Sequence, residues 1–317
     1  MRGEKNLAYG ADLLAYGGIP TFMRQAATRD LETLDVAVVG IPYDGGATSY
    51  RSGARLAPRA IRNASPLLWG FHREHAIAPL GVLRVGDYGD VRVSPGDAEA
   101  TLESVYQEAS TILRAGVHIL ALGGDHSITL PLLRAHAEHY GPLALLHLDA
   151  HADTWPGPWD HSSVFRLARE EGLIDPTAWI QVGIRGPLWS EADITTPTRL
   201  GAQVWTTGDC HTRGMAAVIA AARQAIGTKP LYLSLDLDAF DPAFAPAVGT
   251  PEVGGLTSYQ GLQLLRGLKG VHIVGADIVE LCPPYDAAEI TAILAANLAF
   301  EVLALMALAH QPSLGTP

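Results

Sequence analysis

The sequence predicts an α/β fold: a three-layer αβα sandwich around a mainly parallel sheet. Short apolar runs that end at Gly or Asp alternate along the chain with longer segments of helical period, which is the pattern of repeated βα units. Several of these runs are apolar at consecutive positions, as a parallel strand requires when helices cover both of its faces. Helices on both faces of one sheet give the three layers.

Each expected strand is one of the apolar runs, and each expected helix is one of the periodic segments between them. Strands are expected at residues 36–40, 118–122, 143–148, 179–182, 231–235 and 273–279. Helices are expected at residues 98–114, 128–140, 164–171, 215–226, 259–268 and 287–308. In an open sheet of this kind, ligands bind at the carboxyl ends of the strands. The residues that follow each strand are therefore the candidates for function.

The composition is that of a globular chain with a large core. Of the 317 residues, 48% are hydrophobic and 17% are charged, which excludes a disordered chain. The formal net charge is −11, from 22 Lys and Arg against 33 Asp and Glu, which argues against nucleic acid as a partner because phosphate binding needs a basic surface. No linker or repeat divides the chain. We expect one domain over residues 36–317 and an extension over residues 1–35 that packs on the core or on a neighbouring subunit.

The chain carries the features of a protein from a reducing compartment. Cys210 and Cys282 are its only cysteines, so a disulfide scaffold is excluded. The first residues contain no continuous apolar run of the kind found in secretory signals. One long apolar stretch, residues 291–310, is interrupted by Asn297 and Glu301, which favours a buried helix over a membrane span. We expect a cytoplasmic protein without a membrane partner.

Three of the predicted strand ends carry unusual chemistry. The strand at residues 118–122 is followed by Gly123-Gly124-Asp125-His126-Ser127. The glycines allow a tight turn with close backbone approach, and Asp125 or Ser127 can cap the helix that follows. His126 then lies near the carboxyl end of this strand. Taken alone, a histidine in a loop is a weak indication of a ligand.

The second strand end is more specific, because Asp149, His151 and Asp153 follow the strand at residues 143–148 at alternate positions. In extended chain these three side chains project to one side and can converge on one point. Two carboxylates that flank an imidazole beside an apolar strand repel one another unless a cation lies between them. The alternative is a solvated polar loop. His147 has the same parity but lies inside the strand, where a hydrogen-bonded core histidine is expected.

The third strand end repeats this geometry with Asp236 and Asp238, which close the strand at residues 231–235. Asp241 precedes Pro242 and is explained by turn chemistry, so it is not counted as a ligand. The candidate metal ligands are His126, Asp149, His151, Asp153, Asp236 and Asp238.

Four carboxylates and two imidazoles suit a pair of divalent cations. Their four negative charges match two such ions, and six ligands are too many for one ordinary transition-metal centre that keeps an open position. The excess of oxygen donors and the absence of thiolate favour Mn²⁺ over structural Zn²⁺, and the nitrogen donors leave Ni²⁺, Co²⁺ and Fe²⁺ as alternatives. Two neighbouring ions that share a water molecule lower its pKa, so hydrolysis is the natural chemistry.

These motifs resemble the ureohydrolase family, whose members include arginase and agmatinase. The resemblance covers nearly the whole chain and rests on GGDHS at 123–127, DAHAD at 149–153 and SLDLDAFDP at 234–242, with further matching segments at 40–44, 53–55 and 58–62. It implies the arginase-like parallel-sheet fold, two manganese ions with Asp149 and Asp236 as bridging ligands, and a homotrimer or homohexamer. His126 and Asp153 would complete one ion's ligand set, and His151 and Asp238 the other's.

Within the family the chain looks closest to agmatinases, through segments 160–161, 171–176, 181–185, 241–246, 254–257 and 277–281. The loop between Asp153 and Phe165 lacks the Asn- and Ser-containing pattern with which arginases hold the amino acid end of arginine. One departure concerns the pocket, because agmatinases usually have Gly-Thr where this chain has Ser162-Ser163. That difference bears on which substrate is accepted.

The resemblance also implies three catalytic residues. His161 would pass a proton to the leaving amine, Asp153 would accept a proton and orient the attacking hydroxide, and Glu280 would pair with the guanidinium in bidentate fashion. The alternatives are a solvated loop histidine for His161 and a surface charge for Glu280. Three aromatic residues, Tyr43, Trp155 and Trp159, could line the pocket, although packing roles are the simpler expectation.

The predicted reaction is the metal-dependent hydrolysis of a small cationic guanidino compound with release of urea, with agmatine converted to putrescine. The alternatives that keep this chemistry are guanidinobutyrate, guanidinopropionate, a biguanide and free guanidine, for which nickel is an option in the wider family. A two-metal phosphohydrolase would need Lys or Arg beside the aspartates, and residues 143–165 contain neither. A metal-binding pseudoenzyme subunit would have lost ligands or the proton shuttle, and this chain keeps them.

Overall fold

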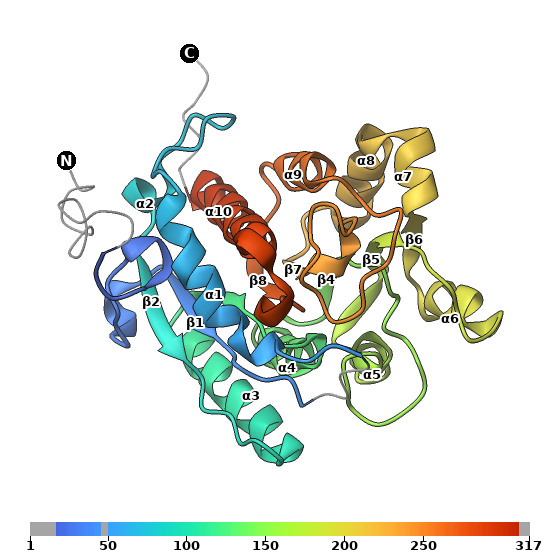
Figure 1. Cartoon of the computed structure of the whole chain (residues 1–317), viewed down its shortest axis with the longest axis horizontal. Coiled ribbons are helices and arrows are strands. Elements are labelled where there is room, and N and C mark those ends of the chain that lie inside the picture. Colours follow the sequence, from blue (N-terminus) through green and yellow to red (C-terminus); the bar gives the residue numbers. More distant parts are fainter. Residues whose placement is uncertain (1–16, 46–49, 311–317) are drawn as a thin grey trace.

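The computed structural model describes residues 17–45 and 50–310, and in this part of the chain one eight-stranded sheet forms the middle layer (Figure 1). The strands are β1 (Val36–Gly40), β2 (Val85–Asp90), β3 (His118–Leu122), β4 (Leu143–Leu148), β5 (Ile174–Ile184), β6 (Gln203–Thr206), β7 (Leu231–Asp236) and β8 (Ile273–Val279). Their order is β2-β1-β3-β8-β7-β4-β5-β6, and every pair is parallel. The predicted fold class is confirmed.

Helices cover both faces of this sheet. They are α1 (Ala57–Ala64), α2 (Pro79–Val82), α3 (Ala98–Arg114), α4 (Thr129–Tyr140), α5 (Val164–Glu170), α6 (Ala192–Leu200), α7 (Thr207–Arg213), α8 (Met215–Ile226), α9 (Ser258–Arg266) and α10 (Ile290–His310). Helices α3, α4 and α5 pack together on one face, and α1, α8, α9 and α10 lie on the other (Figure 1). Alternate residues of β1 enter the two different cores: Val36 and Val38 one, Ala37 and Val39 the other.

The sequence prediction missed two edge strands. Strand β2 has the sequence Val-Gly-Asp-Tyr-Gly-Asp, whose polar and glycine content hides it, and β6 is only four residues long. Both have only one strand neighbour, so neither needs the continuous apolar run that identifies a central parallel strand. Helices α1, α2, α6 and α7 were also not expected. The last helix begins at Ile290, later than expected, because Ala288 has a φ of 62°.

The described part of the expected N-terminal extension lies against β2. Phe22 is fully buried, and its backbone N–H donates to Asp87 Oδ2 at 2.7 Å. Ala27 forms a parallel bridge with Asp87. The Asp87 carboxylate also accepts two hydrogen bonds from Arg62, at 2.8 and 2.9 Å. Residues 17–35 are thus fastened to the edge of the sheet, while residues 1–16 lie outside the described part.

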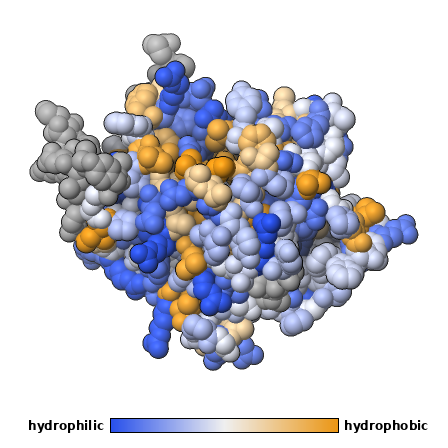
Figure 2. Space-filling view, viewed as in Figure 1, coloured by the Kyte–Doolittle hydropathy of each residue, from blue (hydrophilic) through white to orange (hydrophobic). Residues whose placement is uncertain are grey.

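Helix α10 is a core helix. It is long and apolar enough to cross a membrane by length and composition, but 78% of its most apolar window is buried inside the fold. The one carboxylate that this stretch contains, Glu301, accepts from Arg266 at 2.6 and 2.9 Å and contacts His72 Nε2 at 2.8 Å. On the face shown in Figure 2, apolar side chains occur in small groups among hydrophilic ones. The prediction of a buried helix is therefore confirmed.

Candidate metal centre

Four neighbouring strands deliver the candidate residues to one place. Strands β3, β8, β7 and β4 are adjacent in the sheet and parallel, so their carboxyl ends lie at the same edge. His126 follows β3 and Glu280 follows β8. Asp236 ends β7 and Asp238 follows it, and β4 is followed by Asp149, His151 and Asp153. The cluster that sequence analysis predicts from strand ends is therefore assembled by the order of the strands.

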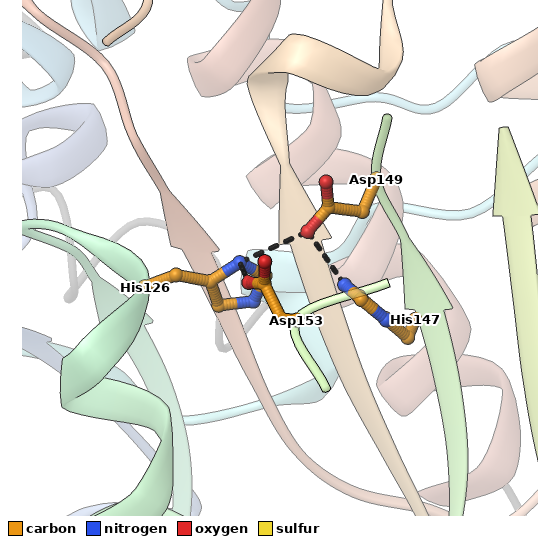
Figure 3. A group of neighbouring side chains, drawn as sticks. All are labelled: His126, His147, Asp149 and Asp153. Atoms are coloured by element: carbon orange, nitrogen blue, oxygen red, sulfur yellow. Dashed lines mark hydrogen bonds and ion pairs between the residues drawn. The ribbon is translucent and has the colours of Figure 1, made fainter. Parts of the chain in front are cut away.

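The first group of possible ligands surrounds His126. This residue begins a single helical turn, His126–Ile128, which Asp125 caps by accepting the Ser127 N–H. Oxygens of three carboxylates lie close to His126 Nδ1: Asp149 Oδ2 at 3.1 Å and Asp153 Oδ2 at 3.0 Å (Figure 3), and Asp236 Oδ2 at 3.0 Å. Yet this buried nitrogen forms no hydrogen bond. One nitrogen and three oxygens that converge in this way are the donor set of a divalent cation.

A second group adjoins the first through Asp149. His151 Nδ1 lies 3.0 Å from Asp238 Oδ2 and 3.5 Å from Asp149 Oδ1. Asp149 therefore faces His126 with one oxygen and His151 with the other. Asp236 directs Oδ2 toward His126, and its Oδ1 accepts the Asp238 N–H at 2.8 Å. All six predicted ligands thus lie in one cluster, and the shared position of Asp149 fits a ligand that bridges two ions.

The pKa values of these groups indicate an excess of negative charge. Burial raises the pKa of Asp236 well above its usual range, and the carboxylates of Asp238 and Asp149 raise it further. Burial alone would lower the pKa of His151, but Asp238 and Asp149 raise it to about 12. Burial would likewise lower the pKa of His126, but the carboxylates of Asp149, Asp153 and Asp236 raise it well above its usual value. Cations are thus favoured throughout the cluster, which suits divalent ions.

His147 supports the cluster as a hydrogen-bond donor. Gln181 Nε2 lies 3.1 Å from His147 Nδ1 and also donates to the Ala152 carbonyl at 2.8 Å, which fixes the orientation of the amide. His147 Nδ1 therefore accepts, so the ring proton is on Nε2, which donates to Asp149 Oδ2 at 2.6 Å (Figure 3). A nitrogen that carries this proton cannot bind a metal ion. This matches the expectation of a hydrogen-bonded core histidine.

Glu280 and His161 meet at the same cavity. Glu280 is 3% exposed, its Oε1 accepts the His126 N–H at 2.8 Å, and the same oxygen lies 3.7 Å from His161 Nδ1. Burial raises the pKa of Glu280 to about 7, and the opposing effect of His161 is smaller. Glu280 and Asp153 both have left-handed backbone conformations, with φ of 67° and 49°. Such strain in residues other than glycine is typical of functional sites.

A cavity of about 230 Å³ opens beside the cluster. It is lined by His151, Asp153, Trp155, His161, Ser162, Pro187, Trp189, Asp236, Asp238, Thr250, Glu252 and Glu280. Of the described residues that line it, none is Lys or Arg. Sequence reasoning missed Glu252, Thr250 and Trp189 here, because their positions in loops carry no periodic signal.

The aromatic and serine candidates divide between cavity and core. Trp155 lines the cavity, whereas Tyr43 stacks on Trp159 with centroids 5.9 Å apart, and Trp159 Nε1 donates to the Ser127 carbonyl. Ser162 reaches the cavity, but its hydroxyl donates to Asp160 Oδ1 at 2.8 Å. The Ser163 hydroxyl is turned away and donates to the Pro158 carbonyl at 2.6 Å. Replacing the usual Gly-Thr therefore changes the cavity wall at one residue.

Comparisons with known proteins point to one family. A family model described as "Arginase family" matches residues 34–305. The chain is 43% identical over 302 residues to a guanidinopropionase of Pseudomonas aeruginosa, with 94% of each chain covered. It is 46% identical over 311 residues to an agmatinase of Chromobacterium violaceum, with 94% of this chain and 92% of the relative covered.

Among solved structures, the proclavaminate amidino hydrolase of Streptomyces clavuligerus matches with a TM-score of 0.90 at 40% identity, covering 94% of this chain and 100% of that one. The fold, the relatives and the family match agree with the ureohydrolase resemblance carried by the three motifs. The chain belongs to the arginase family, whose amidinohydrolases use a binuclear metal site to hydrolyse C–N bonds of linear amidines.

Proposed function

We propose that this amidinohydrolase acts on agmatine and releases urea and putrescine. The observation that carries the proposal is the charge of the cavity. Among the described residues that line it, Lys and Arg are absent, and Glu252 and Glu280 are acidic residues outside the six proposed ligands. The substrates that give the two relatives their names differ in the charge of the tail: guanidinopropionate ends in a carboxylate, whereas agmatine ends in an ammonium group. An acidic wall favours the cationic tail because a negative cleft concentrates cations.

Glu252 is the residue that we assign to the tail. It lines the cavity on the side of His151, with Oε1 4.0 Å from His151 Nε2, and is not one of the six proposed ligands. Its carboxylate therefore keeps its charge when the metal site is filled. An ammonium group beside it forms a charge-assisted hydrogen bond, whereas a tail carboxylate is repelled.

The proposed metal ions are two Mn²⁺, with Ni²⁺ as the alternative. His126, Asp149, Asp153 and Asp236 would hold one ion, and Asp149, His151, Asp236 and Asp238 the other. When bound, the two ions would supply an activated water for attack on the guanidinium carbon. The oxygen-rich donor set and the absence of thiolate support Mn²⁺.

The side chains around the cavity take the remaining roles. Glu280 pairs with the guanidinium, since each carboxylate oxygen keeps acceptor capacity after Oε1 has accepted the His126 N–H. Gly249 leaves room for this carboxylate, because a Cβ there would lie 3.0 Å from Glu280 Oε2. His161, next to Glu280, donates a proton to the departing amine, and Asp153 accepts one from the attacking water.

A substrate panel tests the proposal. Urea release is measured with agmatine, guanidinobutyrate, guanidinopropionate, a biguanide and guanidine, using protein reconstituted with Mn²⁺ or with Ni²⁺. The expected result is the highest kcat/KM for agmatine with Mn²⁺. Glu252→Gln should lower kcat/KM for agmatine about tenfold, since one charge-assisted contact is lost, and leave free guanidine unchanged because it has no tail. A higher kcat/KM for another guanidino compound refutes the substrate, and no urea from any compound refutes the activity.

A further inference from the structure

Behind His126, on the side away from the carboxylates, lies a buried chain of hydrogen bonds. His126 Nε2 contacts Ser234 Oγ at 2.8 Å, and Ser234 Oγ donates to Asp277 Oδ1 at 2.7 Å. Ser234 in β7 and Asp277 in β8 are register partners in the sheet. Both side chains are fully buried, with no exposed surface. The contacts run from the centre of the sheet to a proposed metal ligand.

The direction of these hydrogen bonds follows from Asp277. Its Oδ2 accepts from the Tyr232 hydroxyl at 2.8 Å and from Thr129 Oγ1 at 2.9 Å, while Oδ1 accepts from Ser234. A carboxylate has only acceptors, so each hydroxyl spends its single proton on it. Ser234 Oγ therefore has no proton left for His126 and can only accept one. The proton of the neutral His126 ring lies on Nε2, and the lone pair is on Nδ1.

This tautomer matters because the carboxylates around His126 Nδ1 attract protons as well as metal ions. Three of their oxygens lie 3.0–3.1 Å away, so a proton on Nδ1 would be stabilised there and would block coordination. We propose that Asp277 and Ser234 are positioning residues that hold the single proton of the neutral His126 ring on Nε2, so that Nδ1 is the nitrogen that binds a metal ion. The inference rests on the metal site of the proposed function but not on the identity of the substrate.

Asp277→Asn reverses the direction of the hydrogen bonds from residue 277 through Ser234 to His126 and keeps the shape of the side chain. The amide can turn its oxygen or its NH₂ group toward Ser234. With the oxygen toward Tyr232 and Thr129, both of those hydroxyls keep their acceptor, so this orientation retains the larger number of hydrogen bonds. The amide NH₂ then donates to Ser234 Oγ, whose proton passes to His126 Nε2 and forces the ring proton onto Nδ1. We expect Mn²⁺ to bind this variant roughly 10- to 100-fold more weakly, the usual effect of losing such a partner.

Ser234→Ala provides the contrast, because it removes the connection without reversing it. His126 can then choose either tautomer, and the loss of Mn²⁺ affinity should be less than about tenfold. The double variant Ser234→Ala/Asp277→Asn should bind Mn²⁺ as Ser234→Ala does, because the amide no longer has a hydroxyl through which to act. Thr129→Val is the matched control: it removes one donor to Asp277 and leaves the Ser234 proton in place, so affinity should stay within about threefold.

The full chain is stripped of metal by chelation and titrated with Mn²⁺ by calorimetry, and thermal unfolding verifies that each metal-free variant is folded. ¹⁵N NMR of the metal-free wild type, at a pH high enough for the His126 ring to be neutral, reports which ring nitrogen carries the single proton, even if a variant fails to fold. A neutral wild-type ring with its proton on Nδ1 overturns the proposal. Wild-type affinity in Asp277→Asn, or a double variant that binds as weakly as Asp277→Asn, also overturns it. Because these readouts do not involve urea, failure of the proposed activity is seen separately.

Discussion

Replacing Glu280 with Gln removes one negative charge from the cavity and hardly changes the volume of the side chain. The amide oxygen can still accept the His126 N–H that now bonds to Oε1 at 2.8 Å, so the local backbone should hold. What is lost is the charged pair with the guanidinium. A hydrogen bond to a charged group contributes about 1.5–3 kcal/mol, and two are weakened here, so a loss of about 3 kcal/mol is expected. That corresponds to a fall of about 150-fold in kcat/KM.

The assay is urea release from agmatine at a measured metal content. Because the guanidinium is bound before any bond changes, most of the loss should fall on KM. Glu252→Gln is the matched control, since it makes the same chemical change in the same cavity. Free guanidine should be hydrolysed less well by Glu280→Gln and equally well by Glu252→Gln. A kcat/KM for Glu280→Gln within twofold of wild type, at full metal content, would refute the assigned role.

Three further predictions concern stability. Burial lowers the pKa of His136 to about 4 from 6.5. The fold should therefore lose about 3 kcal/mol of stability as the pH falls from 6.5 to 4, because only the unfolded chain gains this proton in that range. His136→Gln should remove that part of the loss, as measured by urea unfolding at each pH. Chelation should lower Tm in calorimetry, because ions bound only to the folded chain at about 100 times Kd add about 2.7 kcal/mol; an unchanged Tm would contradict a built metal site. Gly124→Ala should destabilise by about 1–3 kcal/mol in chemical denaturation, because its Cβ would overlap the Tyr43 carbonyl.

The sequence was sufficient to predict the central strands and the residues at their ends. Strands β3, β4, β7 and β8 are buried on both faces and read as mostly apolar runs, so the polar residues that follow each run stand out. The six candidate ligands and Glu280 were found in this way or through the family motifs. The edge strand β2 escaped because a strand with one neighbour tolerates the Gly and Asp residues that usually indicate a loop.

The partners of the ligands could not be predicted, because they depend on strand order. Nothing local shows that β8 lies between β3 and β7, or that β7 lies beside β4. Ser234, Asp277 and Gln181 each occur as an isolated polar residue with apolar residues on both sides, and such a residue does not by itself indicate a function. Loop residues were equally hidden: Glu252 reaches the cavity only because its loop folds back beside His151.

The register of the sheet explains why these scattered polar residues belong together. Asp277, Ser234, His147 and Gln181 are successive register partners across β8, β7, β4 and β5, so they form one polar row through the buried sheet. All four are fully buried.

Burying a polar row is unfavourable unless its members bond to something, and this one is connected at two points to the metal cluster. Asp277 acts through Ser234 on His126, and Gln181 acts through His147 on Asp149. In both cases the outer residue determines which ring nitrogen of a histidine carries the proton. One histidine is thereby left with a free nitrogen for a metal ion, and the other with an N–H for the carboxylate that faces both ligand groups. Both rings thus carry the proton on Nε2, but with different results. Ser234 accepts the Nε2 proton of His126, which leaves Nδ1 for a metal ion, whereas Gln181 donates to Nδ1 of His147, which directs the Nε2 proton to Asp149.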